Sequence, residues 1–330
     1  MTSSQTPQSK AEAAEVLLKL ASQGTMVDGT TLCVRDYYKH CPLTGYRPRW
    51  SMVFRVPTPE PTIVKTGPYV TPSEVENMAL IRTKTTIPVP EVYDCWEDPE
   101  SGWWCIWMSC VEGVLLTDQY EFLNDAEKSH LASQLRGYLA QTQMMRKHRG
   151  PIAAADGKPS CDQMLQQHQR TYATEETFRE HIIDGFLDRA GEAEQEEGVK
   201  EDGDAEINAI AREIHDLTPE QPDSLTFTHG NFTPRNIVIQ PTTVDEGGPQ
   251  VVGVLDWSQA GYYPAYWEYV KMSCCEQVEI VMKATGQLRP AEPGFLRDEM
   301  PDHLLEDHFP VEAQAFRRAY RKVWGHSDDL

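Results

Sequence analysis

Three observations predict a two-lobed α+β fold for this chain. Its 330 residues are too many for one small domain and suit two lobes that share a cleft. Residues 25–110 are rich in short runs of β-branched and aromatic residues, with one helical segment among them. The remainder is mostly helical in pattern and contains an embedded β-hairpin. We therefore expect a β-rich N-terminal lobe over residues 1–110 and a helical C-terminal lobe over residues 111–330.

Short segments between prolines and glycines make up the front part. A helix is expected first, because Ser9 can cap it, apolar residues recur at helical spacing, and Gly24 ends it. Two strands, a second helix and a hairpin follow. The expected positions are 9–24 for the first helix, 51–56 and 62–66 for the strands, 74–82 for the second helix, and 91–96 with 103–108 for the hairpin.

The rear part begins with a long helix. Asn124 and Glu127 form a capping box at its start, and Gly150-Pro151 is expected to end it. Residues 188–204 are acidic and poor in apolar residues, so we expect a solvated loop there. The remaining expected elements are strands at 225–228, 236–240 and 251–255, and a helix at 310–324.

The charge of the chain limits its partners. With 30 basic and 51 acidic residues, the formal net charge of -21 repels phosphate backbones and anionic lipids, so neither nucleic acid nor a membrane is an expected partner. No apolar run approaches the roughly 20 residues that span a bilayer. The N-terminus does not resemble a signal peptide, and the eight cysteines form no C-x-x-C pair, so we expect a cytoplasmic protein with reduced thiols. Its size suits a monomer.

The densest group of polar residues follows the apolar run at 225–228. His229-Gly230 makes a turn, Asn231 and Asn236 are five residues apart, and Asp256 ends a later strand. A hairpin would return Asp256 to the side of Asn236. One carboxylate and one amide oxygen suit Mg²⁺, which takes its other ligands from water and phosphate. A polar turn and a strand-end aspartate without function remain the alternative.

Lys65 is a second candidate. It lies inside an apolar strand, where a cation is costly to bury unless an acidic group meets it. Glu74 and Glu76 on the next helix can supply that acid. An edge-strand lysine whose ammonium group reaches water remains the alternative.

Together these segments resemble the aminoglycoside phosphotransferase and choline kinase-like group of enzymes, and within it a fungal small-molecule branch. The resemblance spans about residues 45–270 and implies a two-lobed protein-kinase-like fold. It rests on IVKTG (63–67), EVENMALIR (74–82), TTIPVPEVYD (85–94), MSCVEG (108–113), THGNFTPRNIVI (228–239), GVLDW (253–257) and GYYPAYWEY (261–269).

The resemblance implies roles on the nucleotide side. Lys65 would hold the α- and β-phosphates of ATP and would pair with Glu74. The segment from Met108 to Cys110 would be the hinge that meets adenine through backbone groups. Asn236 and Asp256 would ligate Mg²⁺.

Further roles are implied nearer the acceptor, a small-molecule substrate. His229 would orient the catalytic loop rather than act as a base. Trp257, Tyr263, Trp267 and Glu268 lie where family members shape the acceptor side. A structural role in the core remains the alternative for the three aromatic residues.

Two departures from the family pattern bear on activity. Asn231 stands where the family carries its catalytic aspartate, and a neutral amide cannot accept the proton of a hydroxyl. A general base contributes about 10²–10⁴-fold, so the change implies a weakened kinase or an altered reaction. An engineered substitution at this position remains open. The loop expected to cover the phosphates, 41–50, has one glycine, although Arg47, Arg49 and Arg55 can compensate or bind another anion.

Three functions follow from these patterns. The first is ATP- and Mg²⁺-dependent phosphoryl transfer to a hydroxyl of a small molecule in secondary metabolism, with a degenerate catalytic base. The second is a repurposed kinase fold that catalyses a cyclisation, a pericyclic step or an isomerisation on an apolar metabolite. The third is a non-catalytic pseudokinase. Lys65, Glu74, Asn236 and Asp256 favour the first, and Asn231 with the glycine-poor loop favours the second.

Overall fold

The computed structural model describes most of the middle of the chain. The described residues are 26–27, 30–31, 34–37, 39, 51–56, 58, 60–162, 170–197, 202–217, 224–242, 247–274, 304–305 and 309–324. The helix predicted at 9–24 and the phosphate-covering loop predicted at 41–50 lie outside them.

By its contacts the chain divides into two compact units. The first unit comprises Met1–Val75 and Pro90–Val111, and the second comprises Glu76–Val89 and Glu112–Leu330. Helix α3 (Pro72–Lys84) crosses this division, so its first turn belongs to the first unit and the rest to the second.

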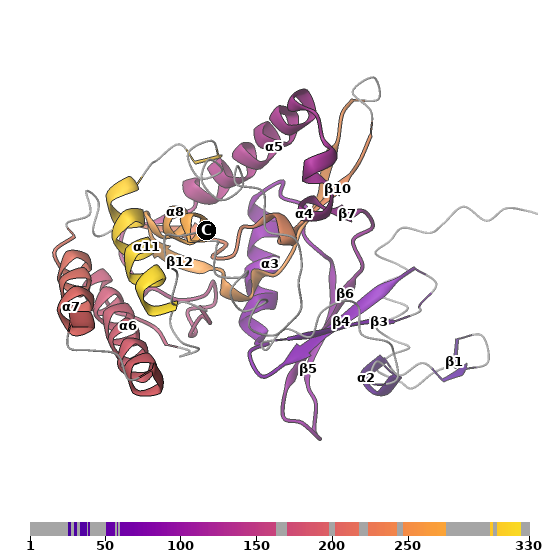
Figure 1. Ribbon diagram of the computed structural model, residues 1–330. Helices are drawn as coiled ribbons and strands as arrows, with labels where there is room; N and C mark the ends of the chain where they lie inside the picture. The colour runs from indigo at the N-terminus through magenta and orange to yellow at the C-terminus, as the bar shows by residue number, and fades with distance from the viewer. Residues whose placement is uncertain are drawn as a thin grey trace, which may run out of the picture. The chain divides into compact units, whose positions relative to one another are not determined.

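A four-stranded antiparallel sheet with the order β3-β4-β6-β5 forms the body of the first unit (Figure 1). The strand pairings β3–β4, β4–β6 and β5–β6 confirm the two predicted strands and the predicted hairpin. A short two-stranded sheet precedes them in the chain. The strands are β1 (Met26–Val27), β2 (Thr30–Thr31), β3 (Met52–Val56), β4 (Thr62–Gly67), β5 (Val92–Glu97) and β6 (Trp104–Ser109).

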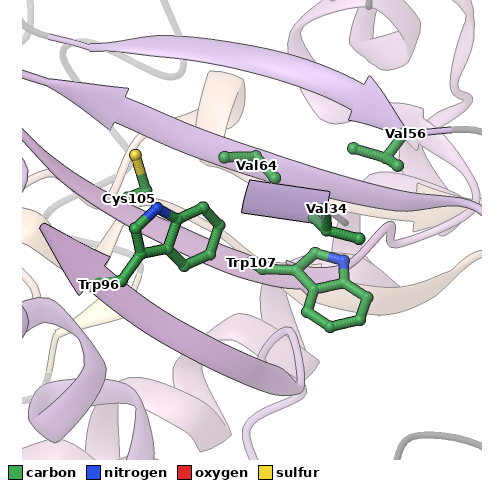
Figure 2. Close-up of a cluster of buried hydrophobic side chains, with 6 residues drawn as sticks. All are labelled: Val34, Val56, Val64, Trp96, Cys105 and Trp107. Atoms are coloured by element: carbon green, nitrogen blue, oxygen red, sulfur yellow. The ribbon is translucent and has the colours of Figure 1, made fainter. Parts of the chain in front are cut away.

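One face of this sheet carries the buried core of the first unit. Val34 reaches it from α2 (Val34–Tyr37), a single turn of helix. Because successive side chains of a strand point to opposite faces, Val64 on this face directs Lys65 to the other face. The side chains that meet in this core are Val34, Val56, Val64, Trp96, Cys105 and Trp107 (Figure 2).

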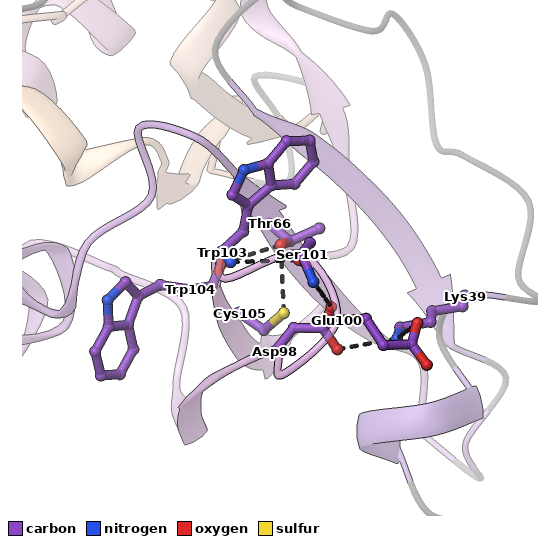
Figure 3. Close-up of polar contacts among 8 residues, drawn as sticks. All are labelled: Lys39, Thr66, Asp98, Glu100, Ser101, Trp103, Trp104 and Cys105. Atoms are coloured by element: carbon purple, nitrogen blue, oxygen red, sulfur yellow. Dashed lines mark hydrogen bonds and ion pairs between the residues drawn. The ribbon is translucent and has the colours of Figure 1, made fainter.

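Ion pairs link Lys39, two residues after the end of α2, to the turn of the β5–β6 hairpin (Figure 3). Nζ of Lys39 lies 2.9 Å from Oδ1 of Asp98 and 2.8 Å from Oε2 of Glu100. Asp98 also accepts hydrogen bonds from the backbone and the hydroxyl of Ser101, which closes the hairpin turn. Ion pairs near the surface contribute little to stability. The burial of Val34 therefore contributes more to the attachment of α2 to the sheet.

Two small sheets build the strand part of the second unit. In the first, β10 (Ile237–Gln240) pairs with β11 (Gln250–Val254), as the sequence predicts, and also with β7 (Val114–Leu115). The second sheet has the order β12-β9-β8. Its strands are β8 (Arg146–Lys147), β9 (Leu225–Thr228) and β12 (Gly261–Pro264).

Helices complete the second unit, and α6, α7 and α11 pack against one another (Figure 1). None of the helices in the described part of the chain is long and apolar enough to cross a membrane. The helices are α4 (Leu116–Gln119), α5 (Asp125–Met144), α6 (Glu175–Glu197), α7 (Asp202–His215), α8 (Trp267–Ser273) and α11 (Pro310–Trp324).

The start of α5 is confirmed, whereas its predicted end is wrong. The Asn124 side chain accepts from the Glu127 backbone N–H, and the Glu127 carboxylate accepts from the Asn124 N–H. The helix ends at Met144 rather than at Gly150-Pro151. The reason is tertiary, because the residues that follow pair with β9 as strand β8.

The predicted acidic loop at 188–204 is also wrong for the described part of that range, which is 188–197 and 202–204. Helix α6 continues to Glu197, and α7 already begins at Asp202. Glutamate, glutamine and alanine are strong helix formers, so an acidic composition that resists burial is still compatible with a solvated helix.

Candidate active site

Lys65 and Glu74 form an ion pair inside the first unit. Nζ of Lys65 lies 2.7 Å from Oε1 of Glu74, and the two side chains are only 8% and 2% exposed. The pairing with Glu74 is confirmed, and Glu76 is exposed. The edge-strand alternative is wrong, because β4 is hydrogen-bonded to β3 on one side and β6 on the other. A buried ion pair is weak evidence for stability, which makes this one a candidate functional feature.

The predicted hinge residues lie at the end of β6. Met108 is buried and pairs with Ile63 of β4. The Cys110 N–H donates to the carbonyl of Pro61 at 3.1 Å. These bonds tie the segment into the sheet, and its contact with adenine stays a prediction.

The predicted catalytic loop leaves β9 through a tight turn at Gly230. Its φ of 74° is in the left-handed region, and a Cβ atom there would lie 2.7 Å from the carbonyl oxygen of Gln259. Only glycine fits both conditions without displacing the backbone. The turn carries the chain from β9 toward Asn231.

Both ring nitrogens of His229 form hydrogen bonds with the backbone around this loop. Nδ1 accepts a hydrogen bond from the Asn231 backbone N–H at 3.1 Å, so the proton of the neutral ring is on Nε2. Nε2 lies 3.0 Å from the carbonyl oxygen of Leu255, to which it donates. With one nitrogen accepting and the other donating, the ring is positioned as an orienting group rather than as a base.

Three predicted catalytic residues converge beside the β10–β11 hairpin. Nδ2 of Asn231 donates to Oδ2 of Asp256 at 3.0 Å, and Nδ2 of Asn236 donates to the Asn231 carbonyl oxygen at 2.9 Å. The Leu255 N–H donates to the Asn236 carbonyl oxygen at 2.7 Å, which brings the strand end beside that residue. The return of Asp256 to the side of Asn236 is therefore confirmed.

The backbone of Asp256 is held in an uncommon conformation. Among the described residues it is the only non-glycine residue with a positive φ, at 62°. Such conformations cluster at functional sites and persist where surrounding contacts fix them. Oδ1 of Asp256 accepts from the hydroxyl of Ser258 at 2.8 Å, so both carboxylate oxygens have a donor.

The donor set is suited to Mg²⁺. Asp256 offers a carboxylate, and the hydrogen bond from Nδ2 of Asn236 orients that amide so that its oxygen is the atom that can ligate. Within the described residues no three His, Cys, Asp or Glu side chains gather into a metal site. A magnesium ion here would complete its shell with water and phosphate oxygens, as Mg²⁺ usually does.

Glu268 holds the start of the catalytic loop by hydrogen bonds to its backbone. In the first turn of α8, its two carboxylate oxygens accept the backbone N–H groups of His229 and Gly230. Burial raises the pKa of Glu268 to about 7, although these two hydrogen bonds and the nearby Lys271 oppose the rise. Glu268 thus contacts the loop backbone from within the core. The available sequence signal was an acidic residue in an otherwise apolar run.

The predicted acceptor-side aromatics are inside the core of the second unit. Trp257, Tyr263 and Trp267 have no exposed surface. Nε1 of Trp257 donates to the Val254 carbonyl at 2.9 Å, and the Tyr263 hydroxyl lies 2.6 Å from Oγ of Ser160. Burial and these bonds favour the core role that the sequence left as the alternative.

A buried charged network surrounds Lys271 of α8, and no sequence pattern predicts it. Nζ of Lys271 lies 2.6 Å from Oδ1 of Asp162 and 3.0 Å from Oε1 of Gln259. Trp267 donates to the other oxygen of Asp162 at 3.0 Å. These groups lie in segments far apart in the sequence, so no local pattern links them.

Comparison with known families identifies the chain. A family model described as "APH: Phosphotransferase enzyme family" matches residues 44–299. The chain belongs to the phosphotransferase enzyme family. The predicted resemblance and the α+β, protein-kinase-like fold are thereby confirmed, whereas the fungal branch stays a prediction. No curated protein sequence matches this phosphotransferase-family chain.

Several solved structures share weak overall similarity with this phosphotransferase-family chain. An apo thermostable mutant of aminoglycoside phosphotransferase APH(4)-Ia has 17% identity over 86% of this chain and 94% of that one, with a TM-score of 0.49. A ternary complex of such a mutant with ADP and hygromycin B has 16% identity over 87% and 94%, with a TM-score of 0.48. A GDP and kanamycin complex of APH(2")-IIIa has 13% identity over 86% and 80%, also with a TM-score of 0.48.

Proposed function

We propose that this chain is an ATP- and Mg²⁺-dependent phosphotransferase that acts on a hydroxyl of a small molecule, as a cytoplasmic monomer of secondary metabolism. The observation that carries the proposal is that Asn236 and Asp256 are each hydrogen-bonded to Asn231, with Asp256 in a left-handed conformation. Membership of the phosphotransferase family supports it. Structures of family proteins with ADP or GDP support a nucleotide as the ligand class.

The protein's own groups would divide the work as follows. Lys65, held by Glu74, provides a fixed cation for phosphate oxygens. Asp256 and Asn236 provide two oxygen ligands. When bound, Mg-ATP supplies the transferable phosphoryl group and the charge compensation that the acidic chain needs. Positioning and electrostatics dominate phosphoryl transfer, so these groups would support a slow reaction in which the hydroxyl proton passes to water.

Asn231 is the reason to keep a second candidate. Its amide donates to the Asp256 carboxylate and has no basic atom for a hydroxyl proton. A repurposed enzyme that catalyses a cyclisation, a pericyclic step or an isomerisation would have no use for that base. A pseudokinase would likewise keep the frame and lose turnover.

Calorimetric titration with ATP, in Mg²⁺ and then in EDTA, tests the proposal. The matched variant is Asp256→Asn, because asparagine tolerates the left-handed conformation, its amide oxygen can still accept from Asn231, and the Ser258 hydroxyl can accept from its amide nitrogen. We expect wild-type binding that requires Mg²⁺, and an affinity at least about 100-fold weaker in the variant, since the negatively charged metal ligand is replaced by a neutral amide. Absence of any wild-type heat would favour the repurposed enzyme. Binding that ignores both Mg²⁺ and the variant would favour a pseudokinase.

A further inference from the structure

Asn77 is a fully buried polar residue on α3 whose side chain bonds to two other segments of the second unit. Its Nδ2 donates to the carbonyl oxygens of Trp257 at 3.1 Å and Ala260 at 2.8 Å. Its Oδ1 accepts the backbone N–H of Ala155 at 2.9 Å. Both amide protons and the amide oxygen are therefore engaged, although the nearest partner in sequence is 78 residues away.

The two carbonyls that Asn77 holds belong to the turn that follows Asp256. This turn runs through the 3-10 segment Trp257–Gln259, and the Ala260 N–H closes it onto the Trp257 carbonyl at 3.2 Å. Asp256 enters the turn in the left-handed conformation. A non-glycine residue stays in that conformation only where its surroundings fix it.

Hydrogen bonds to the backbone on both sides of Asp256 fix its conformation. Before it, the carbonyls of Val254 and Leu255 accept from the Trp257 and His229 side chains. After it, the carbonyls of Trp257 and Ala260 accept from Asn77. Without the Asn77 amide, two buried carbonyls would lose their side-chain donor, and the far side of the turn would lose its link to α3.

We propose that Asn77 is a positioning residue for the Asp256 carboxylate: it fixes the turn after Asp256 and thereby the aim of the metal ligand. The metal part of this inference rests on the proposed function. Outer-shell partners of this kind are worth about 10–100-fold in metal affinity. A residue that served only the core would affect the stability of the whole unit and not the turn in particular.

Met78 supplies the matched control. It is the next residue on α3, is also buried, and its side chain is apolar, so Met78→Ala removes packing without removing a donor to the turn. Asn77→Ala removes all three hydrogen bonds. Asn77→Ser keeps one hydroxyl donor and is the milder variant if Asn77→Ala does not fold.

The first measurement needs no metal or nucleotide. Hydrogen exchange in the metal-free full chain is followed in the peptide that covers residues 255–261. We expect exchange at least about 10-fold faster in Asn77→Ala than in wild type, an intermediate rate in Asn77→Ser, and the wild-type rate in Met78→Ala. Equal acceleration by the Asn77 and Met78 variants would overturn the inference, since it would indicate a general loss of packing.

The second measurement is the Mg²⁺ concentration that half-saturates the thermal shift in the presence of ADP. We expect it to rise about 10–100-fold in Asn77→Ala and to stay unchanged in Met78→Ala. A faster-exchanging turn with an unchanged Mg²⁺ requirement would overturn the positioning role. If wild type shows no Mg²⁺ response, the proposed function fails, and the exchange comparison alone decides whether Asn77 holds the turn.

Discussion

The polar centres of the two units differ in how their charges are matched. In the first unit, the Lys65 cation meets the Glu74 anion at 2.7 Å inside the sheet–helix packing. In the second unit, the Asp256 carboxylate meets the neutral Asn231 amide at 3.0 Å. The first is a complete ion pair, whereas the second has one charged member where the resemblance predicts two.

The difference indicates what an asparagine at residue 231 does beside the Asp256 carboxylate. Two carboxylates at this distance would repel each other without a cation between them. The Asn231 amide donates a hydrogen bond to Asp256 instead, so this pair carries no charge repulsion when no metal is bound. An asparagine also offers no proton acceptor at the position where the resemblance predicts one, while the groups proposed to hold phosphate and metal are present.

The largest stability effect is expected from breaking the complete pair. Lys65→Met leaves the buried Glu74 carboxylate without this cation, which should lower the free energy of unfolding by about 3–5 kcal/mol. The double variant Lys65→Met/Glu74→Leu removes both charges and should recover most of the loss. Urea unfolding of the three proteins measures this. A single variant as stable as wild type would show that the pair is not desolvated in solution.

A smaller effect on stability, which depends on pH, is expected from Glu268, whose carboxylate accepts from the backbone just before Asn231. The pKa of Glu268 is raised from 4.5 to about 7 in the folded protein. The folded state therefore binds this proton more tightly than the unfolded state. Its contribution to stability is complete below pH 4.5 and is lost as the pH rises toward and through 7, with a magnitude on the order of 3 kcal/mol.

Glu268→Gln tests this sign. Glutamine does not titrate and, like a protonated Glu268 carboxyl, keeps one carbonyl acceptor for the two loop N–H groups. The unfolding free energy of wild type minus that of the variant should therefore fall as the pH rises from 4.5 and should level off above 7. Urea unfolding at several pH values gives that difference. A difference that is independent of pH would contradict the raised pKa of Glu268.

The smallest effect is expected at Ser258. Its hydroxyl donates to Oδ1 of Asp256, and Ser258→Ala should cost about 1 kcal/mol of stability. It should also weaken Mg²⁺ binding about 10-fold, because outer-shell partners orient metal ligands. Thermal shift with ADP across Mg²⁺ concentrations measures both. Tighter Mg²⁺ binding in the variant would show that the serine competes with the metal instead of orienting its ligand.

The parts of the site that the sequence predicts are those coded by local pattern. The apolar strands on either side of the turn at Gly248 bring Asp256 beside Asn236. An isolated lysine in an apolar strand predicts an acidic partner on the next helix, and the family resemblance narrows that partner to Glu74. Both relations depend on residues that are near in sequence or adjacent through one hairpin.

The parts that the sequence does not predict depend on distant backbone groups. Glu268 bonds to an N–H 39 residues away, and Asn77 bonds to a carbonyl 180 residues away. No local spacing of residues in the sequence therefore indicates either bond. The three aromatics near Glu268 could not be divided between core and acceptor side, because both roles use the same side chains. The loop predicted within 188–204 was wrong for a different reason. Glutamate is hydrophilic, which suggests a solvated loop, but it is also a strong helix former.

The most direct test of the incomplete pair is the rate of ATP hydrolysis by Asn231→Asp, with water as the acceptor and Asn231→Ala as the control. If the metal and phosphate groups are intact and only the proton acceptor is missing, Asn231→Asp should raise the rate by about 10²–10⁴-fold at saturating Mg²⁺, while Asn231→Ala stays near wild type. Hydrolysis that is no faster in Asn231→Asp than in wild type, with Mg-ATP still bound, would contradict this account and favour the repurposed enzyme.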